Sequence, residues 1–355
     1  MSLFLLLTLL LSVTTEHVLV FRETDRFAGW PANHGIWNWG DEILVGFLLG
    51  HHQEKEGHTI NNDLPQVARF ARSMDGGKTW KIEVPAFLDA AEKEKMPVEL
   101  MVPLECNHPD FVLQIRMWKG SPTRSYFHYS YDRGHTWQGP YWLPMFDRPG
   151  ILARTDYLVN GKHDITLFLT SAKADGQEGW PFVARSTDGG LTWKHQAWIG
   201  KEPEAGGYAI MPSAVRLSNE ELLVWIRCRS KSSEQRSFWI EPYRSNDNGN
   251  TWILEKEHSI DNAGNPAHMI KLRDGRLAVT YGYRRVPYGI RAKLSEDGGK
   301  TWSREEILRE DGHNWDLGYP RTVQRSDGKL VTVYYYNDAN QKERYIAATI
   351  WDLQP

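Results

Sequence analysis

The sequence is poor in cysteine and in net charge. Cys106 and Cys228 are its two cysteines, so the chain can form at most one disulfide, and no cysteine spacing resembles a metal site. Lys and Arg total 42 against 45 Asp and Glu, which leaves a net charge of −3 at pH 7. This balance gives no basis for binding nucleic acid or an anionic membrane. We therefore expect neither of these partners, and no cofactor or metal.

Long apolar segments are also lacking. The strongest run covers residues 3–11, includes seven leucines and is too short to cross a bilayer. A buried strand would alternate or favour β-branched residues, whereas the length of this run and the small residues after it are typical of a signal peptide. We expect residues 1–15 to be a signal peptide, residues 16–355 to form one domain, and the protein to be secreted or periplasmic.

What the sequence does contain is a motif, S-x-D-x-G-x-T-W, that occurs five times. The interval from one motif tryptophan to the next is between 50 and 59 residues. Such regular self-similarity marks one supersecondary unit repeated around an axis or along a stack. The five copies occupy residues 73–80, 130–137, 186–193, 245–252 and 295–302.

Each copy of the motif follows a β-rich run, so it is predicted to lie in a turn between strands. Asp, Ser and Thr oxygens accept hydrogen bonds from turn N–H groups, Gly adopts the positive φ, and Trp buries a large ring. The motif therefore indicates a structural element rather than a site of chemistry.

The segments between the motifs predict six similar units. Hairpin-type pairs such as Asn160-Gly161 and Asp274-Gly275 precede strongly apolar strands. The last unit has no motif, and its final strand (residues 345–351) is predicted to pair with residues 17–22 and so close a ring. The six units begin near Asn33, Asn107, Arg154, Met211, Asn265 and Tyr319.

The repeated motif resembles the Asp box of the sialidase (neuraminidase) superfamily and of its bacterial-neuraminidase-repeat (BNR) relatives. Five copies cover nearly the whole chain. The resemblance implies an all-β fold, a six-bladed β-propeller of sialidase type. It also implies that the boxes lie on the face opposite the active site.

In a propeller, the starts of the innermost strands and the ends of the second strands meet at one opening. Here these positions are rich in Arg, His and Tyr. Arg binds carboxylates in two-pronged fashion, and His and Tyr transfer protons near neutral pH. Each residue alone has an ordinary structural explanation, but their convergence from at least five blades favours one site. The candidates are His34, His51, His108, Arg154, Arg227, His268, Arg284, Tyr319 and Arg321.

The resemblance implies roles for some of these residues. Sialidases hold a substrate carboxylate with three arginines and use a Tyr nucleophile, a Glu that assists it and an Asp acid/base. Tyr319 matches the nucleophile, Arg227 matches the second arginine, and Arg284 or Arg285 matches the third. The Glu is missing at Met211-Pro212, and His51-His52 stands where the Asp is expected. We therefore expect Tyr319, His51 and His108 to be catalytic and the other candidates to bind substrate.

Three functions remain open. The first is an exo-acting glycoside hydrolase that removes a terminal acidic sugar such as sialic or uronic acid. The second is a uronate polysaccharide lyase, because propeller ulvan lyases resemble this site in using His, Tyr and Arg. The third is a non-catalytic propeller that stacks sugars on Trp30, Trp37 and Trp39. The many titratable groups favour an enzyme, which we expect to be a monomer acting on an acidic glycan.

Overall fold

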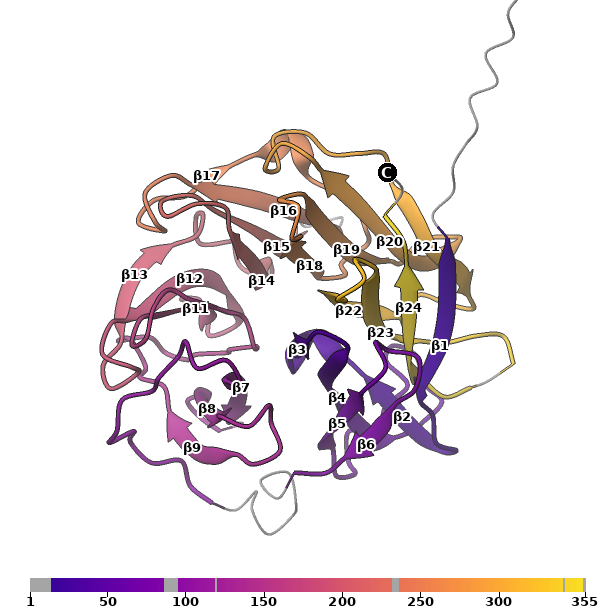
Figure 1. Ribbon diagram of the computed structural model, residues 1–355, viewed down its shortest axis with the longest axis horizontal. Helices are drawn as coiled ribbons and strands as arrows, with labels where there is room; N and C mark the ends of the chain where they lie inside the picture. Colours follow the sequence, from indigo (N-terminus) through magenta and orange to yellow (C-terminus); the bar gives the residue numbers. More distant parts are fainter. Residues whose placement is uncertain (1–13, 86–94, 119, 232–235, 341, 354–355) are drawn as a thin grey trace, which may run out of the picture.

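In the computed structural model of the protein, six small β-sheets surround a central axis (Figure 1). The structure describes residues 14–85, 95–118, 120–231, 236–340 and 342–353. Helical structure within these ranges is limited to short 3-10 turns such as η1 (Pro31–Asn33) and η4 (Lys256–His258). In the same ranges, no helix is both long and apolar enough to cross a membrane. The predicted six-bladed propeller is confirmed.

The first two blades depart from the regular pattern of four strands. Blade one contains β2 (Arg26–Gly29), β3 (Ile36–Trp39), β4 (Glu42–His51), β5 (Val67–Ser73) and β6 (Lys81–Glu83). Its innermost strand is split, because β2 and β3 pair with opposite ends of β4. Blade two contains β7 (Val112–Trp118), β8 (Arg124–Ser130) and β9 (Gln138–Trp142), and no innermost strand among the described residues.

Blades three to five each contain four antiparallel strands. Blade three is β10 (Tyr157–Val159), β11 (Ile165–Ala172), β12 (Glu178–Ser186) and β13 (Lys194–Trp198). Blade four is β14 (Tyr208–Arg216), β15 (Leu222–Lys231), β16 (Arg236–Ser245) and β17 (Ile253–Leu254). Blade five is β18 (Ala267–Lys271), β19 (Leu277–Tyr283), β20 (Tyr288–Ser295) and β21 (Glu306–Gly312).

Blade six closes the ring with strands from both ends of the chain. It contains β22 (Gly318–Gln324), β23 (Leu330–Tyr336), β24 (Tyr345–Trp351) and β1 (Thr15–Phe21). β1 pairs antiparallel with β24, with His17 opposite Thr349. The predicted closure is confirmed. Of the predicted signal peptide, residues 1–13 lie outside the described residues, and Thr15 already belongs to β1.

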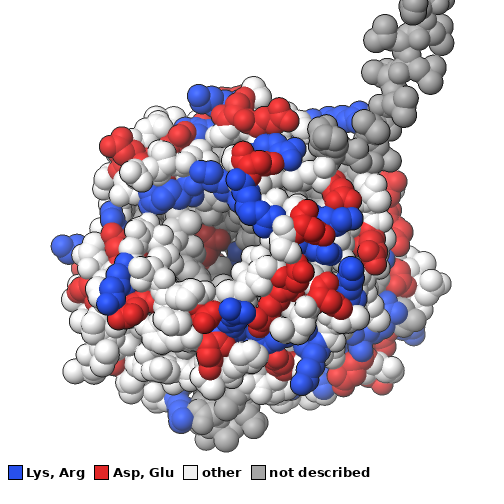
Figure 2. Space-filling view, viewed as in Figure 1, with Lys and Arg blue, Asp and Glu red and all other residues white. Residues whose placement is uncertain are grey.

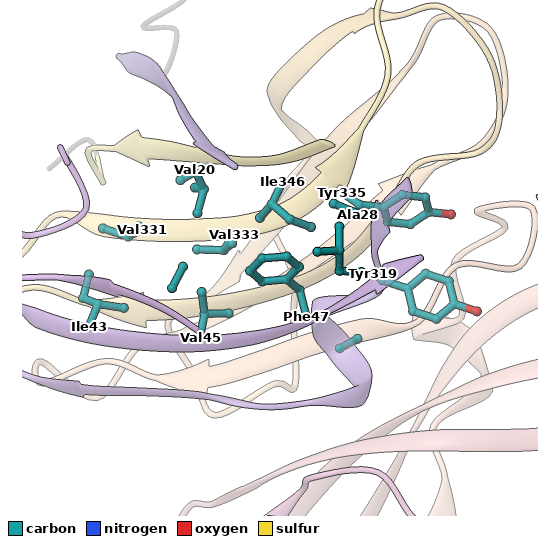
Figure 3. Close-up of a cluster of buried hydrophobic side chains, with 14 of the residues drawn as sticks. Val20, Ala28, Ile43, Val45, Phe47, Tyr319, Val331, Val333, Tyr335 and Ile346 are labelled. Carbon is teal, nitrogen blue, oxygen red and sulfur yellow. The ribbon is translucent and has the colours of Figure 1, made fainter. Parts of the chain in front are cut away.

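The apolar cluster between blades six and one shows how this closure places functional side chains. Alternate residues of β4, including Val45 and Phe47, face Val333 of blade six across the junction (Figure 3). Tyr319 and Tyr335 lie at one end of this cluster, and both hydroxyls point the same way, out of the apolar region (Figure 3). The junction therefore fixes the rings of both tyrosines and leaves their polar ends free to interact.

The five Asp boxes form one turn repeated five times. In every box, the Thr hydroxyl donates to the Asp carboxylate at 2.6 Å, and a Gly N–H donates to the Ser hydroxyl. In the second box, Asp132 also accepts from Ser130 at 2.6 Å and from the backbone N–H of Thr136 at 2.8 Å. The carboxylate thus organises the turn, as the sequence predicted.

Replacing Asp132 by alanine tests this structural role. The variant removes the acceptor for Ser130 and Thr136, so the free energy of unfolding should fall by about 1–3 kcal/mol. Chemical denaturation measures this change, and Asp132→Asn, which keeps one acceptor oxygen, should lose less. Any activity per folded molecule should be unaltered, and loss of activity without loss of stability would contradict a structural role.

Candidate active site

Three X-Pro pairs mark the end of the propeller opposite the boxes, here called the mouth. Trp30, Met211 and Tyr319 precede prolines and have φ values of 60°, 55° and 50°. The pairing register of β14 shifts at Met211 and that of β22 shifts at Tyr319. A left-handed conformation in residues other than glycine costs of order 1–3 kcal/mol and concentrates at functional sites. These bulges turn side chains out of the strand alternation.

Tyr319 and Arg227 form the centre of the mouth. Nη1 of Arg227 donates to the Tyr319 hydroxyl at 2.7 Å, and Asn265 accepts the Tyr319 backbone N–H at 2.9 Å. The guanidinium carbon of Arg284 lies 5.5 Å from the centre of the Tyr319 ring. The structure therefore brings together the three residues that the resemblance matched to sialidase positions.

Arg284 connects this centre to a second group of polar side chains. Its Nη2 donates to the Tyr335 hydroxyl at 2.7 Å, and Tyr335 donates to Asp316 Oδ1 at 2.8 Å. The same carboxylate oxygen lies 2.5 Å from Nδ1 of His58. Burial raises the pKa of Tyr335 well above its ordinary value, so it remains a neutral donor. Arg284, Tyr335, Asp316 and His58 thus form one continuous network.

The charges around Asp316 keep it ionised. Burial opposes ionisation, but the hydrogen bond from His58 and the charges of His58, Arg344 and Arg284 outweigh burial and lower the pKa of Asp316 to about 2. Nε of Arg344 donates to Oδ2 at 3.1 Å. The side chain of His58 is 35% exposed and packs between Trp30 and Trp315, at 5.3 and 5.2 Å between ring centres. An imidazole oriented by a carboxylate at a solvent-open position is suited to proton transfer.

Other arginines at the mouth already have partners. The guanidinium carbon of Arg229 lies 4.3 Å from the centre of the Tyr208 ring. The guanidinium carbon of Arg227 lies 5.3 Å from the centre of the same ring. Arg154 forms a two-pronged ion pair with Glu178. Arg154 therefore meets a carboxylate of the protein rather than a free position for substrate.

Arg321 and His268 face the central axis below the mouth. Arg321 donates to Asp156 at 3.3 Å and to the carbonyls of Ala32 and Thr155 at 2.7 and 2.6 Å. Although Arg321 is two residues from Tyr319, the bulge at Tyr319 separates the directions of the two side chains. Arg321, which was expected to bind substrate, is therefore directed to Asp156 rather than to Tyr319.

The axis itself is hollow. A cavity of 270 Å³ is lined by Asp156, His268 and Arg321, and a second of 430 Å³ continues from His268 to Lys271 and Arg273. Figure 2 shows a central hollow on the face toward the viewer, with Lys and Arg side chains along part of its rim. Burial raises the pKa of Asp156 to about 6, against the opposing charge of Arg321. The ring thus has polar groups along its axis as well as at its mouth.

The remaining predicted histidines do not join Tyr319. His51 lies on β4 opposite Arg26, and the structure shows no contact between it and the Tyr319–Arg227 pair. His108 lies beside Tyr131 of the second box, at 5.2 Å between ring centres. The reason is that blade two has no innermost strand among the residues that the structure describes, so His108 precedes a second strand at the box end. His34 is buried beside Arg116, between blades one and two.

Comparison with known families is consistent with this geometry. The sequence pattern of the BNR repeat-like domain family matches residues 111–332, which is more than half of the chain. The chain belongs to the BNR repeat-like domain family. The resemblance to BNR proteins of the sialidase superfamily is thereby confirmed. Comparison with curated protein sequences gives no match.

Solved structures share the fold of this BNR protein at low sequence identity. A Dyadobacter fermentans protein of unknown function is 21% identical, with TM-score 0.75 and coverage of 97% of this chain and 100% of that one. The GH93 α-L-arabinofuranosidase of Fusarium graminearum is 14% identical (TM-score 0.64, 95% and 97% covered). Trypanosoma rangeli sialidase is 12% identical (TM-score 0.60), and the match covers 95% of this chain but 59% of the sialidase.

Sequence reasoning missed three functional candidates of this BNR protein. His58 follows the second strand of blade one, later than the expected position at residues 51–52. Asp316 lies three residues before Tyr319, so its closeness to the predicted nucleophile could have marked it as a site residue. Glu178 gave no signal, because it begins a third strand. Within the described ranges, no group of three or more His, Cys, Asp and Glu side chains could hold a metal ion.

Buried neutral histidines predict sensitivity to acid. Burial, assisted by the charge of Arg321, lowers the pKa of His268 well below 6.5. Burial also lowers the pKa of His34 and of His128 to about 3. The unfolded chain therefore binds protons that the folded chain does not. This stabilisation is complete above pH 6.5 and is lost as the pH falls toward 3, at about 1.4 kcal/mol per pH unit for each histidine.

Replacing His268 by glutamine tests this linkage. Glutamine keeps an acceptor for the Thr322 N–H, which His268 accepts at 2.9 Å, but does not titrate. Denaturation of the variant across the pH window from about 4 to about 6 should show a shallower dependence of unfolding free energy, by roughly one proton. His135→Gln, at an exposed side chain, serves as the control for the substitution itself. Equal slopes for His268→Gln and wild type would contradict the neutral buried state.

Proposed function

We propose that the protein is a carbohydrate-active enzyme that hydrolyses the glycosidic bond of a terminal acidic sugar. The observation that carries this proposal is the hydrogen bond from Arg227 to the Tyr319 hydroxyl, with Arg284 beside the same ring. The two guanidinium groups provide charge for a substrate carboxylate next to a potential nucleophile. The solved glycosidases of the same fold support a glycosidase-type activity, and the acidic substrate is inferred from the arginines.

In the proposed reaction, Tyr319 is the nucleophile. Arg227 donates to its oxygen and so stabilises negative charge there once the phenolic proton has passed to solvent. The Tyr319 oxygen attacks the anomeric carbon as the bond from that carbon to the leaving oxygen breaks. The leaving oxygen receives a proton, and a covalent glycosyl–tyrosine intermediate forms.

His58 is the proposed proton donor. Asp316 holds its Nδ1, and Nε2 has no hydrogen-bond partner among the described residues. The imidazolium gives its proton to the leaving oxygen. In the second half of the reaction, neutral His58 takes a proton from the water that attacks the intermediate, and Tyr319 departs as the phenolate. His58 therefore replaces the acidic residue that the resemblance led us to expect.

A uronate lyase is the second candidate, and one observation favours it. Within the part of the chain that the structure describes, no carboxylate contacts the Tyr319 hydroxyl, whereas a His–Asp pair lies at the same mouth. In a lyase, an arginine neutralises the uronate carboxylate, and Tyr319 or His58 removes the proton from C5. The C5–H electrons form the C4–C5 double bond as the C4 oxygen leaves with a proton.

The third possibility was sugar stacking on Trp30, Trp37 and Trp39. Two of these rings, those of Trp37 and Trp39, instead pack within the protein. Trp37 donates to the Tyr157 hydroxyl at 2.9 Å, and Trp39 donates to the carbonyl of Pro109 at 3.1 Å. Both pack in the junction of blades one and two. Only Trp30 lies at the mouth, next to His58.

Product analysis with Tyr319→Phe tests the proposal. Purified protein is incubated with sialosides and with uronate glycans, and released sugar and ultraviolet absorbance are measured. Free acidic sugar without new absorbance indicates hydrolysis, and an absorbing unsaturated uronate indicates a lyase. Tyr319→Phe keeps the ring packing and removes the hydroxyl, so activity should fall by about 10²–10⁴-fold.

The matched control is Tyr129→Phe. Tyr129 is as buried as Tyr319 and donates to Gln138 at 2.6 Å, far from the mouth in blade two. This variant should lose stability without losing activity per folded molecule. Near wild-type turnover of Tyr319→Phe would remove Tyr319 from the mechanism.

Chemical rescue tests His58. His58→Ala should reduce turnover by about 10²–10⁴-fold and leave a space open to solvent. Added imidazole should then restore part of the activity, because a free imidazole can supply the missing proton. Tyr319→Phe should show no rescue. Wild-type activity of His58→Ala, or an imidazole effect equal in the two variants, would show that His58 is not the proton donor.

A further inference from the structure

The junction between blades one and two contains the smallest apolar cluster among the described residues. Its apolar cluster contains three buried side chains, Leu44, Ala68 and Phe70, together with tryptophans that include Trp137 of the second box. Leu113 and Ile115 of β7 face the other way, into the cluster shared with blade three. The alternate residues of β7 therefore face blade one, and toward the mouth this face is polar.

Arg116 lies on this face without an acidic partner. Its Nη1 is buried and has no hydrogen-bond acceptor, and no carboxylate of the described residues lies within ion-pair distance of its guanidinium. Arg72 and Arg154, by contrast, are held by glutamates. Removing a charge from water without a partner is unfavourable, so an unpaired guanidinium at a cavity points to an anionic ligand.

Two histidine side chains near Arg116, those of His34 and His128, are uncharged. Burial, followed by the charge of Arg116, lowers the pKa of both His34 and His128 to about 3. Both rings are therefore neutral at pH 7. His34 comes from blade one and His128 from blade two, so the arginine lies between the two blades.

A cavity of 130 Å³ opens at this position. Its lining includes Asn33, His34, Arg116 and Arg154. Oδ1 of Asn33 is buried without a hydrogen-bond partner, so the cavity wall has a second unsatisfied polar group. Arg154, which lies at the mouth in an ion pair with Glu178, is also part of this lining.

Aromatic side chains continue the same face outward from Arg116. Strand register places Arg116 opposite Tyr126 and Trp118 opposite Arg124, and Tyr126 opposite Trp142. The rings of Trp118, Tyr126 and Trp142 meet edge to face at 5.8–6.3 Å between centres. The guanidinium carbon of Arg124 lies 3.8 Å from the Trp142 ring. Aromatic rings next to cations suit sugar residues that carry anionic groups.

We propose that Arg116, His34 and this aromatic face form a second anionic subsite, which takes the carboxylate or sulfate of a sugar adjacent to the one at Tyr319. The substrate is then a glycan with anionic groups on neighbouring residues rather than a single terminal acid on a neutral chain. This substrate class rests on the proposed function, whereas the anion site itself does not.

Histidine NMR of the intact protein tests the anion site without any need for turnover. Inorganic sulfate is titrated into wild type, Arg227→Gln and Arg116→Gln, and the ring signals of His34 and His128 are followed. Saturable shifts should appear in wild type and in Arg227→Gln, and binding should weaken at least about tenfold in Arg116→Gln. Arg116→Lys, which keeps the charge and loses the fork, should be intermediate.

The opposite results overturn the site. Absence of a saturable shift in wild type, or equal affinity in Arg116→Gln, means that sulfate binds only as an adventitious ion. Equal melting temperatures of Arg116→Gln and wild type verify that the variant is folded. If Arg116→Gln unfolds, Arg116→Lys supplies the comparison, and wild-type affinity in that folded variant contradicts two-pronged binding.

Tetragalacturonate and galacturonate test the substrate class. Wild type should bind the tetramer at least about tenfold more tightly than the monomer, and Arg116→Gln should lose this preference. A preference that survives in Arg116→Gln overturns the glycan subsite. If neither sugar binds but sulfate still requires Arg116, a parallel titration with a sulfated oligosaccharide decides between the sources of the anion. If none of these sugars binds, the proposed substrate class is refuted and the anion site stands on sulfate binding alone, whereas failure of the proposed function is read separately from the product analysis on sialosides and uronate glycans.

Discussion

The antiparallel pairing of β1 with β24 is the interaction on which the rest of the structure depends. It adds a strand from the start of the chain to the last blade, and so joins the two ends of the row of sheets into a ring. Closure also creates the apolar cluster between blades six and one. Because Tyr319 and Tyr335 end that cluster, the same packing that completes the fold fixes the two phenols at the mouth.

The two ends of the ring handle polar groups in opposite ways. In the boxes, each Asp carboxylate accepts hydrogen bonds from donors of its own turn, as Asp132 does from Ser130 and Thr136. These carboxylates therefore need no partner from another blade. At the mouth, polar partners come from different blades: Arg227 reaches Tyr319, and Asp316 collects His58, Tyr335 and Arg344. Donors left over after these contacts, in Arg227 and Arg116, are the groups that a ligand can satisfy. Stability is therefore concentrated at one end, and ligand binding is inferred at the other.

The arrangement of side chains at the mouth depends on irregularities in the blades. The innermost strand of blade one is split into β2 and β3. Trp30 and His34 lie in the segment between these two strands, so their side chains do not follow the regular alternation of a continuous strand. Among the described residues, blade two has no innermost strand, and a cavity lined by Arg116 opens between blades one and two. The bulges at Met211 and Tyr319 turn these side chains toward Arg227, which contacts both. A propeller of six identical blades would have none of these features.

The sequence by itself determined the repeat, the six blades, the closing strands and the set of Arg, His and Tyr candidates from which the sialidase resemblance singled out Tyr319, Arg227 and Arg284. These follow from local patterns: a turn motif with fixed chemistry, strand periodicity, and residues at equivalent ends of equivalent strands. Only the tertiary structure decided the rest. His58 and Asp316 meet across 258 residues of chain, and Arg321 is taken by Asp156 from another blade. His108 lies at the box end because the described part of blade two does not include the innermost strand that the repeat predicts. Such pairings depend on packing between blades, and periodicity along one blade carries no information about them.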